Sequence, residues 1–324
     1  MPTPRSSCLI GCLLAVLCSA SSLLADDAAP TFAGLLRTDT RSTFRKVGDY
    51  LKEHPQATDA GRAWKWLFVT ALDQRLEDDA VPYATQYLKS SATDPQTKLL
   101  AQQTLAFGLA RSGQGDAAVD VFQTQLRFAR IQNGREFVDF GLQLATALRM
   151  SGKFEDSKKI LDETASKFFL DGEVRNTCEN KAAKLGLIGK DAPLIEAGDT
   201  KGQPLSLNEL RGKVVLVDFW ATNCGPCLEE FPNLKELYSE YHEKGFEIVG
   251  ISLDGDVALV EAFTQRFQIP WRMIVAEAEV ERLRERYLVR KIPSLYIVNR
   301  EGKVAQFDVR GTDLRATIEG LLKK

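Results

Sequence analysis

Cysteine and histidine are scarce in this chain, and their scarcity excludes two kinds of protein. Of 324 residues, 6 are cysteine and 2 are histidine. Three of the cysteines precede residue 19, in a segment that we expect to be removed, which leaves Cys178, Cys224 and Cys227. These are too few for a scaffold built on disulfides. Zinc takes four ligands, and His54 and His242 lie far in the sequence from the cysteine pair, so we expect neither a metal site nor a cofactor.

A charge imbalance and long hydrophobic runs are also missing. The 42 basic and 44 acidic residues give a formal net charge of −2, so the composition does not favour nucleic acid or an anionic membrane as a partner. The apolar run at residues 8–17 is too short to span a bilayer, and no later run is longer, which excludes a multi-pass membrane protein. Hydrophobic residues at 44% and charged residues at 27% are typical of a globular protein.

Residues 1–25 have the order of features found in an export signal. A basic start and the apolar run are followed by small residues that offer cleavage after Ala20 or Ala25. We therefore expect an exported protein, in the periplasm or another extracytoplasmic compartment. Lipidation at Cys18 and an uncleaved, membrane-anchoring signal stay open as alternatives.

Residues 31–186 predict a separate, all-α domain. Proline is sparse, and leucine, alanine, glutamine, lysine and glutamate predominate, which favours helix. Ser-Gly pairs ending at Gly113 and Gly152, 39 residues apart, each precede a helical pattern, and a looser copy surrounds residues 76–88. This spacing is typical of tetratricopeptide-like (TPR-like) helix pairs, which offer a surface to protein partners. An irregular helical bundle is the alternative. Residues 181–189 read as a linker to the next domain.

The chemistry of the chain is concentrated at residues 213–232, KVVLVDFWATNCGPCLEEFP. A β-branched run at 214–219 predicts a buried strand, and an amphipathic helix follows Cys227. This places a dithiol at a helix N-terminus, where backbone N–H groups stabilise a thiolate. Cys224 would be the nucleophile, and Cys227, one turn deeper, would attack the resulting mixed disulfide. Pro226 suits the first helical turn, where its missing N–H breaks no bond. The alternatives are a structural disulfide and half of a zinc site.

Through this motif and its flanking segments, the chain resembles the thioredoxin superfamily, and in particular its TlpA/ResA-like thiol-disulfide oxidoreductases of the AhpC/TSA–redoxin branch. The resemblance covers residues 187–324. It is carried by VDFWA, CGPC and FP, by the preceding IGKDAPLIEAGDTKGQPLSLNELRGK, and by VRKIPSLYIVNREGKV. It implies an α/β thioredoxin fold, with a mixed central sheet flanked by helices. The chain departs from the family at Asn223, where relatives commonly carry an aromatic residue.

The resemblance also implies roles for residues around the dithiol. Asp218 matches a carboxylate buried behind the deeper sulfur, and Glu230 matches a glutamate of the TlpA/ResA branch. Either would accept the proton that Cys227 loses when it becomes a thiolate. The bond between Ile292 and Pro293 matches a cis peptide that faces the dithiol, where a substrate strand pairs. We expect the substrate to contact Ile292, Pro293, Trp220 and Pro226.

The rest of the domain alternates strand and helix signals. Strands are predicted at 246–252, 294–298 and 304–309, and helices at 257–267, 277–287 and 314–322. Cys178 has two interpretations, and the favoured one is a buried thiol that packs as a small hydrophobe rather than a third redox cysteine.

The sequence thus predicts an exported enzyme that reduces disulfides in extracytoplasmic proteins, such as apocytochromes during cytochrome c biogenesis. The Gly-Pro dipeptide resembles that of reducing thioredoxins. Partners would be protein disulfides or dithiols and a membrane or periplasmic electron donor. Two alternatives are a thiol peroxidase, although Thr222 lies one residue too close to Cys224 for that pattern, and a non-catalytic adaptor that acts through the helical repeats.

Overall fold

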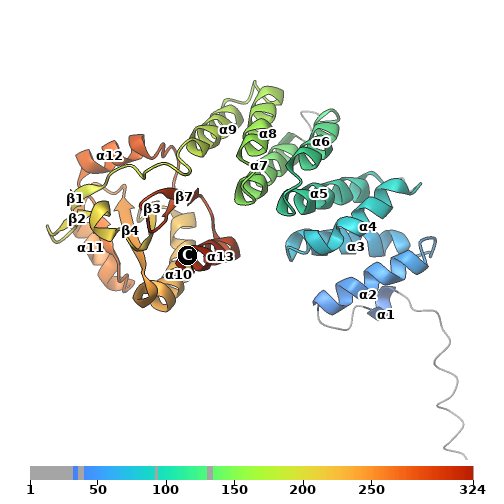
Figure 1. The fold of residues 1–324 in the computed structure, drawn as a ribbon, viewed down its shortest axis with the longest axis horizontal. Helices are drawn as coiled ribbons and strands as arrows, with labels where there is room; N and C mark the ends of the chain where they lie inside the picture. The colour runs from blue at the N-terminus through green and yellow to red at the C-terminus, as the bar shows by residue number, and fades with distance from the viewer. Residues whose placement is uncertain (1–31, 36–39, 92–93, 130–133, 324) are drawn as a thin grey trace, which may run out of the picture. The chain divides into compact units, whose positions relative to one another are not determined.

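The chain folds into two compact units. The computed structural model describes residues 32–35, 40–91, 94–129 and 134–323, and the units divide between Thr104 and Leu105 (Figure 1). The predicted export signal, residues 1–25, lies outside the described residues. Among the helices in the described ranges, none has the length and apolar character needed to cross a membrane.

Within the described residues, the secondary structure of the first unit is α-helix joined by short turns. Its helices are α1 (Phe32–Leu35), α2 (Thr40–Glu53), α3 (Ala60–Asp73), α4 (Glu77–Lys89) and the first part of α5 (Pro95–Arg111). An aromatic cluster joins α3 to α4, since the ring of Trp64 stacks on Phe68 at 5.7 Å and meets Tyr87 edge-on at 5.3 Å. Trp64 is therefore a core residue, as expected for at least one of the two neighbouring tryptophans.

Three helix-to-helix turns share one backbone geometry and follow the predicted repeat. Arg75, Gly113 and Gly152 have positive φ angles of 55°, 78° and 76°, at the ends of α3, α5 and α7. The amide of the following residue donates to a carbonyl five positions back, at Ala71 (2.8 Å), Leu109 (2.8 Å) and Leu148 (2.9 Å). This is the Schellman arrangement, which satisfies free helix carbonyls. The Ser-Gly signals thus mark real helical hairpins, while the tetratricopeptide assignment stays a prediction.

Helices continue into the second unit and end on α9. They are α6 (Gly115–Leu126), α7 (Gly134–Met150), α8 (Phe154–Lys167) and α9 (Gly172–Leu185). Asp171 begins α9 as its N-cap, because its carboxylate accepts from the amides of Glu173 at 3.0 Å and Val174 at 3.1 Å.

The predicted linker at residues 181–189 is wrong in its first half. Residues 181–185 form the last part of α9, and Lys184 is buried with 3% of its surface exposed. A lysine near a glycine usually marks a solvated helix end, but here its ammonium group has partners in the sheet domain. The second compact unit accordingly begins well before residue 187, at Leu105. The predicted division into domains at 31–186 and 187–324 stays a prediction.

The α/β part is a thioredoxin fold, as predicted. Its elements are β1 (Glu196–Gly198), β2 (Pro204–Ser206), the 3-10 turn η2 (Leu207–Leu210), β3 (Val214–Trp220), α10 (Gly225–Tyr241), η3 (His242–Lys244), β4 (Phe246–Ser252), α11 (Val257–Arg266), β5 (Arg272–Ile274), α12 (Glu277–Arg286), β6 (Ser294–Val298), β7 (Val304–Phe307) and α13 (Gly311–Leu322). The sheet order is β5-β4-β3-β6-β7. Strands β3, β4 and β5 are parallel, whereas β6 and β7 are antiparallel to their neighbours, which makes the sheet mixed.

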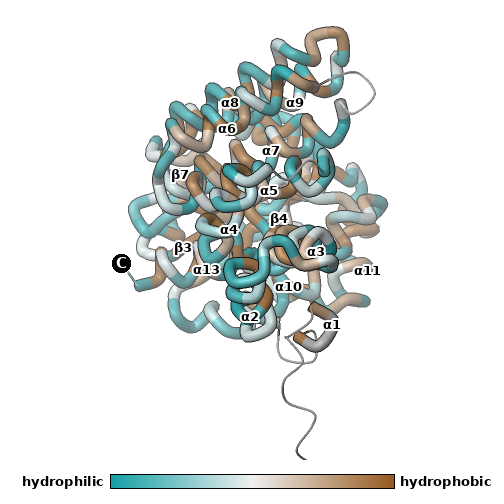
Figure 2. The backbone as a smooth tube through the Cα atoms, turned by 90° about the vertical axis from the view of Figure 1, so that its right-hand side faces the viewer, coloured by the Kyte–Doolittle hydropathy of each residue, from teal (hydrophilic) through white to brown (hydrophobic). Residues whose placement is uncertain are grey.

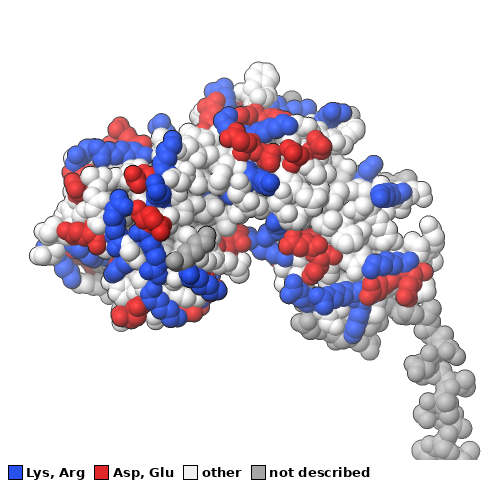
Figure 3. Space-filling model, in the orientation of Figure 1, with Lys and Arg blue, Asp and Glu red and all other residues white. Residues whose placement is uncertain are grey.

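Both faces of the sheet are covered, so β3 is buried along its whole length. Side chains of α10, α11 and α13 join one core cluster with Leu216 and Trp220 of β3. Side chains of α12 and of the β1–β2 hairpin join the other, with Val217 and Phe219. Hydrophobic and hydrophilic stretches alternate along the helices, as amphipathic packing requires (Figure 2). Acidic and basic side chains are interspersed on the face shown in Figure 3, in keeping with the small net charge.

Candidate active site

The two cysteines of the CGPC motif lie at the start of α10, just after the end of β3. Cys224 and Cys227 form a disulfide, with their Cα atoms 5.3 Å apart. Cys224 is the N-cap of α10, and its Sγ accepts the backbone N–H of Cys227 at 3.3 Å. The sulfur of Cys224 therefore occupies the place that an N-cap oxygen takes in other helices, against amides that stabilise negative charge.

The two sulfurs differ in their access to solvent. Cys224 is half-buried, whereas Cys227 is 3% exposed and belongs to the core cluster beneath α10. The rim around Cys224 is open, because Asn223, Gly225 and Pro226 are exposed. A protein substrate would reach Cys224 first, which supports the predicted order of attack. Pro226 lies in the first turn of α10, as predicted.

Asp218 is buried on β3, on the face of the sheet that α10 covers. Side chains alternate along a strand, so Asp218 faces the same side as its neighbours Leu216 and Trp220, which share a core cluster with Cys227. The pKa of Asp218 is raised to about 7, chiefly by burial and also by the charge of Glu230, while the charge of Arg310 opposes the rise. A carboxyl group with this pKa exchanges a proton near neutral pH, as the predicted role requires.

Glu230 lies three residues after Cys227 on α10. It is half-buried, and its Oε1 accepts from the side-chain amide of Asn233 at 2.6 Å. Its charge acts on the pKa of Asp218, so the two predicted acidic residues belong to one electrostatic site. Glu229, its neighbour in sequence, is exposed.

Ile292 and Pro293 directly precede β6. Their peptide bond is cis, as the resemblance implies. Ile292 contacts the core clusters on both faces of the sheet, including the cluster against which Cys224 packs. The carbonyl of Pro293 accepts from the guanidinium of Arg310 at 2.9 Å. Sequence reasoning missed Arg310, which acts on both this carbonyl and the pKa of Asp218.

Trp220 has a different place from the one predicted. It is 0% exposed, so a substrate cannot contact it in this arrangement. Its indole meets the ring of Phe231 edge-on at 4.9 Å and that of Phe263 at 5.2 Å. Gly250 on β4 makes room for Met273, whose sulfur would lie 2.1 Å from a Cβ there, while the indole nitrogen of Trp220 would be in ordinary contact at 3.4 Å. Trp220 supports the base of α10 from below, because its bulk fills the core beneath the dithiol.

A second residue that the sequence did not single out, Asp254, holds the loop before Cys224. Its carboxylate accepts from the amide of Thr222 at 2.9 Å and from the Thr222 hydroxyl at 2.7 Å. The hydroxyl of Ser252 donates to the same carboxylate at 2.7 Å. In the sequence, the one sign of this role was that Asp254 follows the strand β4, which ends at the same edge of the sheet as its parallel neighbour β3.

Cys178 is the one free cysteine in the described ranges. It is 1% exposed on α9, and burial raises the pKa of its thiol to about 11. A thiol of this kind is unreactive at neutral pH, in agreement with the interpretation of Cys178 as a small core residue. Over the same ranges, no group of three or more His, Cys, Asp or Glu side chains is arranged to hold a metal.

Comparison with known proteins agrees with this site. The AhpC/TSA family model matches residues 188–307. A thiol-disulfide oxidoreductase ResA from Bacillus thuringiensis is 32% identical over 137 residues, which are 42% of this chain and 78% of the relative. A ResA from Oceanobacillus iheyensis is 32% identical over 145 residues, 44% of this chain and 74% of the relative.

Solved structures are similar over the same share of the chain. The thioredoxin domain of a thiol-disulfide oxidoreductase from Bacteroides vulgatus is 34% identical, with a TM-score of 0.40, and covers 42% of this chain and 97% of its own. A putative thiol:disulfide interchange protein DsbE from Chlorobium tepidum is 28% identical, with a TM-score of 0.39 and coverages of 42% and 97%.

Proposed function

Because this chain belongs to the family of ResA thiol-disulfide oxidoreductases, we propose that it reduces disulfide bonds of proteins outside the cytoplasm through Cys224 and Cys227. The observation that carries the proposal is the dithiol at the start of α10, with one sulfur within reach of solvent and the other buried one turn deeper.

The reaction follows from this geometry in two displacements. The thiolate of Cys224 attacks one sulfur of the substrate disulfide, and the other substrate sulfur leaves as a thiolate. The thiolate of Cys227 then attacks the sulfur of Cys224 and displaces the second substrate thiolate. The substrate gains two electrons and the enzyme dithiol becomes the disulfide seen here. A protein or small-molecule dithiol must return the two electrons before the next cycle.

Asp218 supplies the proton acceptor for the second displacement. Cys227 is buried, and in the reduced protein its attack requires loss of the thiol proton. The side chain of Asp218 faces the same buried layer, and burial together with the charge of Glu230 raises its pKa to about 7. The carboxylate is thus basic enough near neutral pH to take this proton, and Glu230 tunes it through its charge.

The direction and place of the reaction are also part of the proposal. The Gly-Pro pair between the cysteines resembles that of reducing thioredoxins. Export is supported by the order of basic, apolar and small residues in residues 1–25. Substrates would then be disulfides of exported proteins, apocytochromes among them, with the electrons supplied from the membrane or periplasm. The helical part offers a surface to a protein partner.

A thiol peroxidase is disfavoured by the hydrogen bonds of Thr222. Its hydroxyl donates to Asp254 at 2.7 Å, so it has no proton left to donate to a peroxide at Cys224. The reductase proposal therefore takes precedence, and peroxide consumption is one readout of the test below.

Two assays with the full chain test the proposed function. The protein should accelerate reduction of insulin disulfides by dithiothreitol, and it should not consume hydrogen peroxide above the buffer rate. Titration of the dithiol against glutathione buffers should give a potential near that of thioredoxin, about −270 mV. A potential near that of DsbA, about −120 mV, would instead make the protein an oxidant.

Replacing Glu230 by glutamine should slow release of the substrate near neutral pH without unfolding the protein. Loss of the negative charge lowers the pKa of Asp218, which becomes a weaker base. The midpoint of the pH–rate profile for resolving the mixed disulfide should move to lower pH by on the order of one unit. Stopped-flow measurement of single turnovers at pH 6 to 9 gives this profile.

Glu229→Gln is the matched control, since it removes the same charge from an exposed position on the neighbouring residue. Its profile should coincide with that of the wild type. A Glu230→Gln profile that also coincides with the wild type would remove Glu230 from the mechanism.

A further inference from the structure

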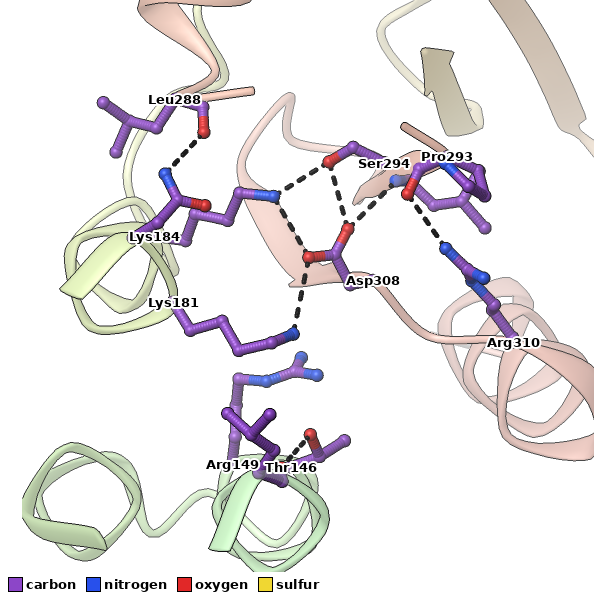
Figure 4. A network of polar contacts seen from close by, with 12 residues as sticks. Thr146, Arg149, Lys181, Lys184, Leu288, Pro293, Ser294, Asp308 and Arg310 are labelled. Carbon is purple, nitrogen blue, oxygen red and sulfur yellow. Dashed lines mark hydrogen bonds and ion pairs between the residues drawn. The ribbon is translucent and has the colours of Figure 1, made fainter. Parts of the chain in front are cut away.

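Helix α9 runs along the segment that carries Ile292 and Pro293. We call residues 288–294 the Pro293 segment. The side-chain amide of Asn180 donates to the carbonyl of Leu288 at 2.8 Å, and the ammonium of Lys184 donates to the hydroxyl of Ser294 at 2.8 Å (Figure 4). Two turns of one helix therefore hold both ends of the Pro293 segment.

Of these two contacts, the one made by Lys184 requires a charged group to be buried. Its side chain is 4% exposed, and its ammonium group lies 3.0 Å from Oδ2 of Asp308 as well as 2.8 Å from the hydroxyl of Ser294. Burial lowers the pKa of Lys184, and the charge of Asp308 opposes this shift. A lysine this deeply buried is uncommon unless it is paired, because its desolvation is unfavourable.

Asp308 joins α9 to the start of β6. Its Oδ2 faces Lys184, while its Oδ1 accepts from the hydroxyl of Ser294 at 3.0 Å and from the amide of Leu295 at 3.3 Å. Asp308 also has a positive φ of 47°, a conformation that a residue with a side chain keeps only when its surroundings hold it. Lys184, Asp308 and Ser294 thus form a closed triangle of hydrogen bonds (Figure 4).

The triangle lies next to the surface where a substrate strand would pair. Ser294 directly follows Pro293, and its backbone is paired with Phe219 on β3, the strand that leads to the dithiol. Arg310 holds the carbonyl of Pro293 from the other side at 2.9 Å. Displacement of Ser294 would therefore move Pro293 relative to Cys224.

We propose that Lys184 is a positioning residue for the reaction with protein disulfides, and that α9 thereby completes the substrate surface of the redox domain. This inference rests on the proposed function, since it concerns how a protein disulfide is received at Cys224. The family model begins at residue 188, after the end of α9, so the element that positions the Pro293 segment lies outside the matched residues. Lys184 acts through Ser294 and does not itself face the dithiol.

Lys184→Met tests this inference in the full chain. The variant should raise the KM for insulin by about tenfold, which is the usual effect of losing one hydrogen bond to a charged group. The rate at which iodoacetamide alkylates reduced Cys224, measured from pH 5 to 9, should match that of the wild type, because the helix N-terminus is untouched. A defect in the dithiol itself would change both quantities.

Lys181→Met is the matched control. Lys181 also pairs with Asp308, at 3.8 Å, but no contact joins it to Ser294 among the described residues. Its KM should stay that of the wild type, and an equal rise in both variants would overturn the inference. An unchanged KM in folded Lys184→Met would overturn it as well, as would slower alkylation of Cys224.

Ser294→Ala keeps the inference testable if Lys184→Met does not fold. This variant removes only the hydroxyl that links Lys184 to the Pro293 segment, so KM should rise in the same direction by a smaller factor. An unchanged KM in folded Ser294→Ala would contradict the inference. If the wild type itself fails to reduce insulin, the proposed function fails instead, which separates the two outcomes.

Discussion

Cys224→Ser is expected to abolish disulfide reduction, so that insulin and dithiothreitol react at the rate of the buffer alone. A serine hydroxyl cannot form a disulfide, and no other cysteine in the described ranges can take the place of Cys224. Cys227 is 3% exposed, and Cys178 is 1% exposed with burial raising the pKa of its thiol to about 11. Insulin turbidity measured against the wild type checks this result.

Cys227→Ser separates the two displacements. This variant keeps the exposed nucleophile but lacks the sulfur that releases the substrate, so it should accumulate a covalent complex between Cys224 and the substrate. Non-reducing mass spectrometry should show one substrate chain per protein, lost on addition of dithiothreitol. Residual reductase activity in Cys224→Ser, or a complex formed through Cys178, would contradict the assigned order of attack.

Asp218→Asn is expected to stabilise the oxidised protein at alkaline pH by about 4 kcal/mol, the free energy that corresponds to the raised pKa of Asp218. The pKa of Asp218 rises from 3.8 in the unfolded chain to about 7 in the fold. Between these values the folded state binds a proton that the unfolded state does not bind. The free energy of unfolding of the wild type therefore falls as the pH rises through this window, and stays low above it.

The asparagine variant lacks this dependence, so the two proteins should be similar in stability near pH 4 and differ most above pH 8. In the oxidised protein neither sulfur of the disulfide titrates, which isolates the effect of Asp218. Amide hydrogen exchange of β3, compared between variants at each pH, reports the stability of this sheet rather than of the whole chain. Curves that stay parallel from pH 4 to 9 would contradict the buried, proton-sharing state of Asp218.

Much of the fold was predictable because its strongest signals are local. The predicted strands at 246–252 and 294–298 coincide with β4 and β6, since both are apolar runs bounded by turn residues. The dithiol was predictable for the same reason, because its strand, turn and helix are contiguous in the chain. Strand β5 was missed, as three residues at a sheet edge carry no periodic pattern.

The parts of the site that the sequence did not reveal depend on contacts between distant residues. Asp254 meets Thr222 across 32 positions, and Lys184 meets Ser294 across 110. A lysine near the end of a helix looks like a solvated residue until the fold buries it. Trp220 was expected to contact the substrate, whereas the packing of β3 against α10 places it in the core.

Asp308 has several positively charged neighbours, and it is the carboxylate that they share. Lys184 and Lys181 both pair with its carboxylate, and the guanidinium of Arg149, which is also buried and stacks 4.1 Å from the ring of Phe307, adds a further positive charge. If either lysine is lost, the acid keeps a counterion. If the acid is lost, several cations are left facing one another in a medium of low polarity. Substitution should therefore be tolerated at Lys181, where Lys184 remains as a counterion of Asp308, and penalised at residue 308, an asymmetry that follows from the ratio of donors to acceptors.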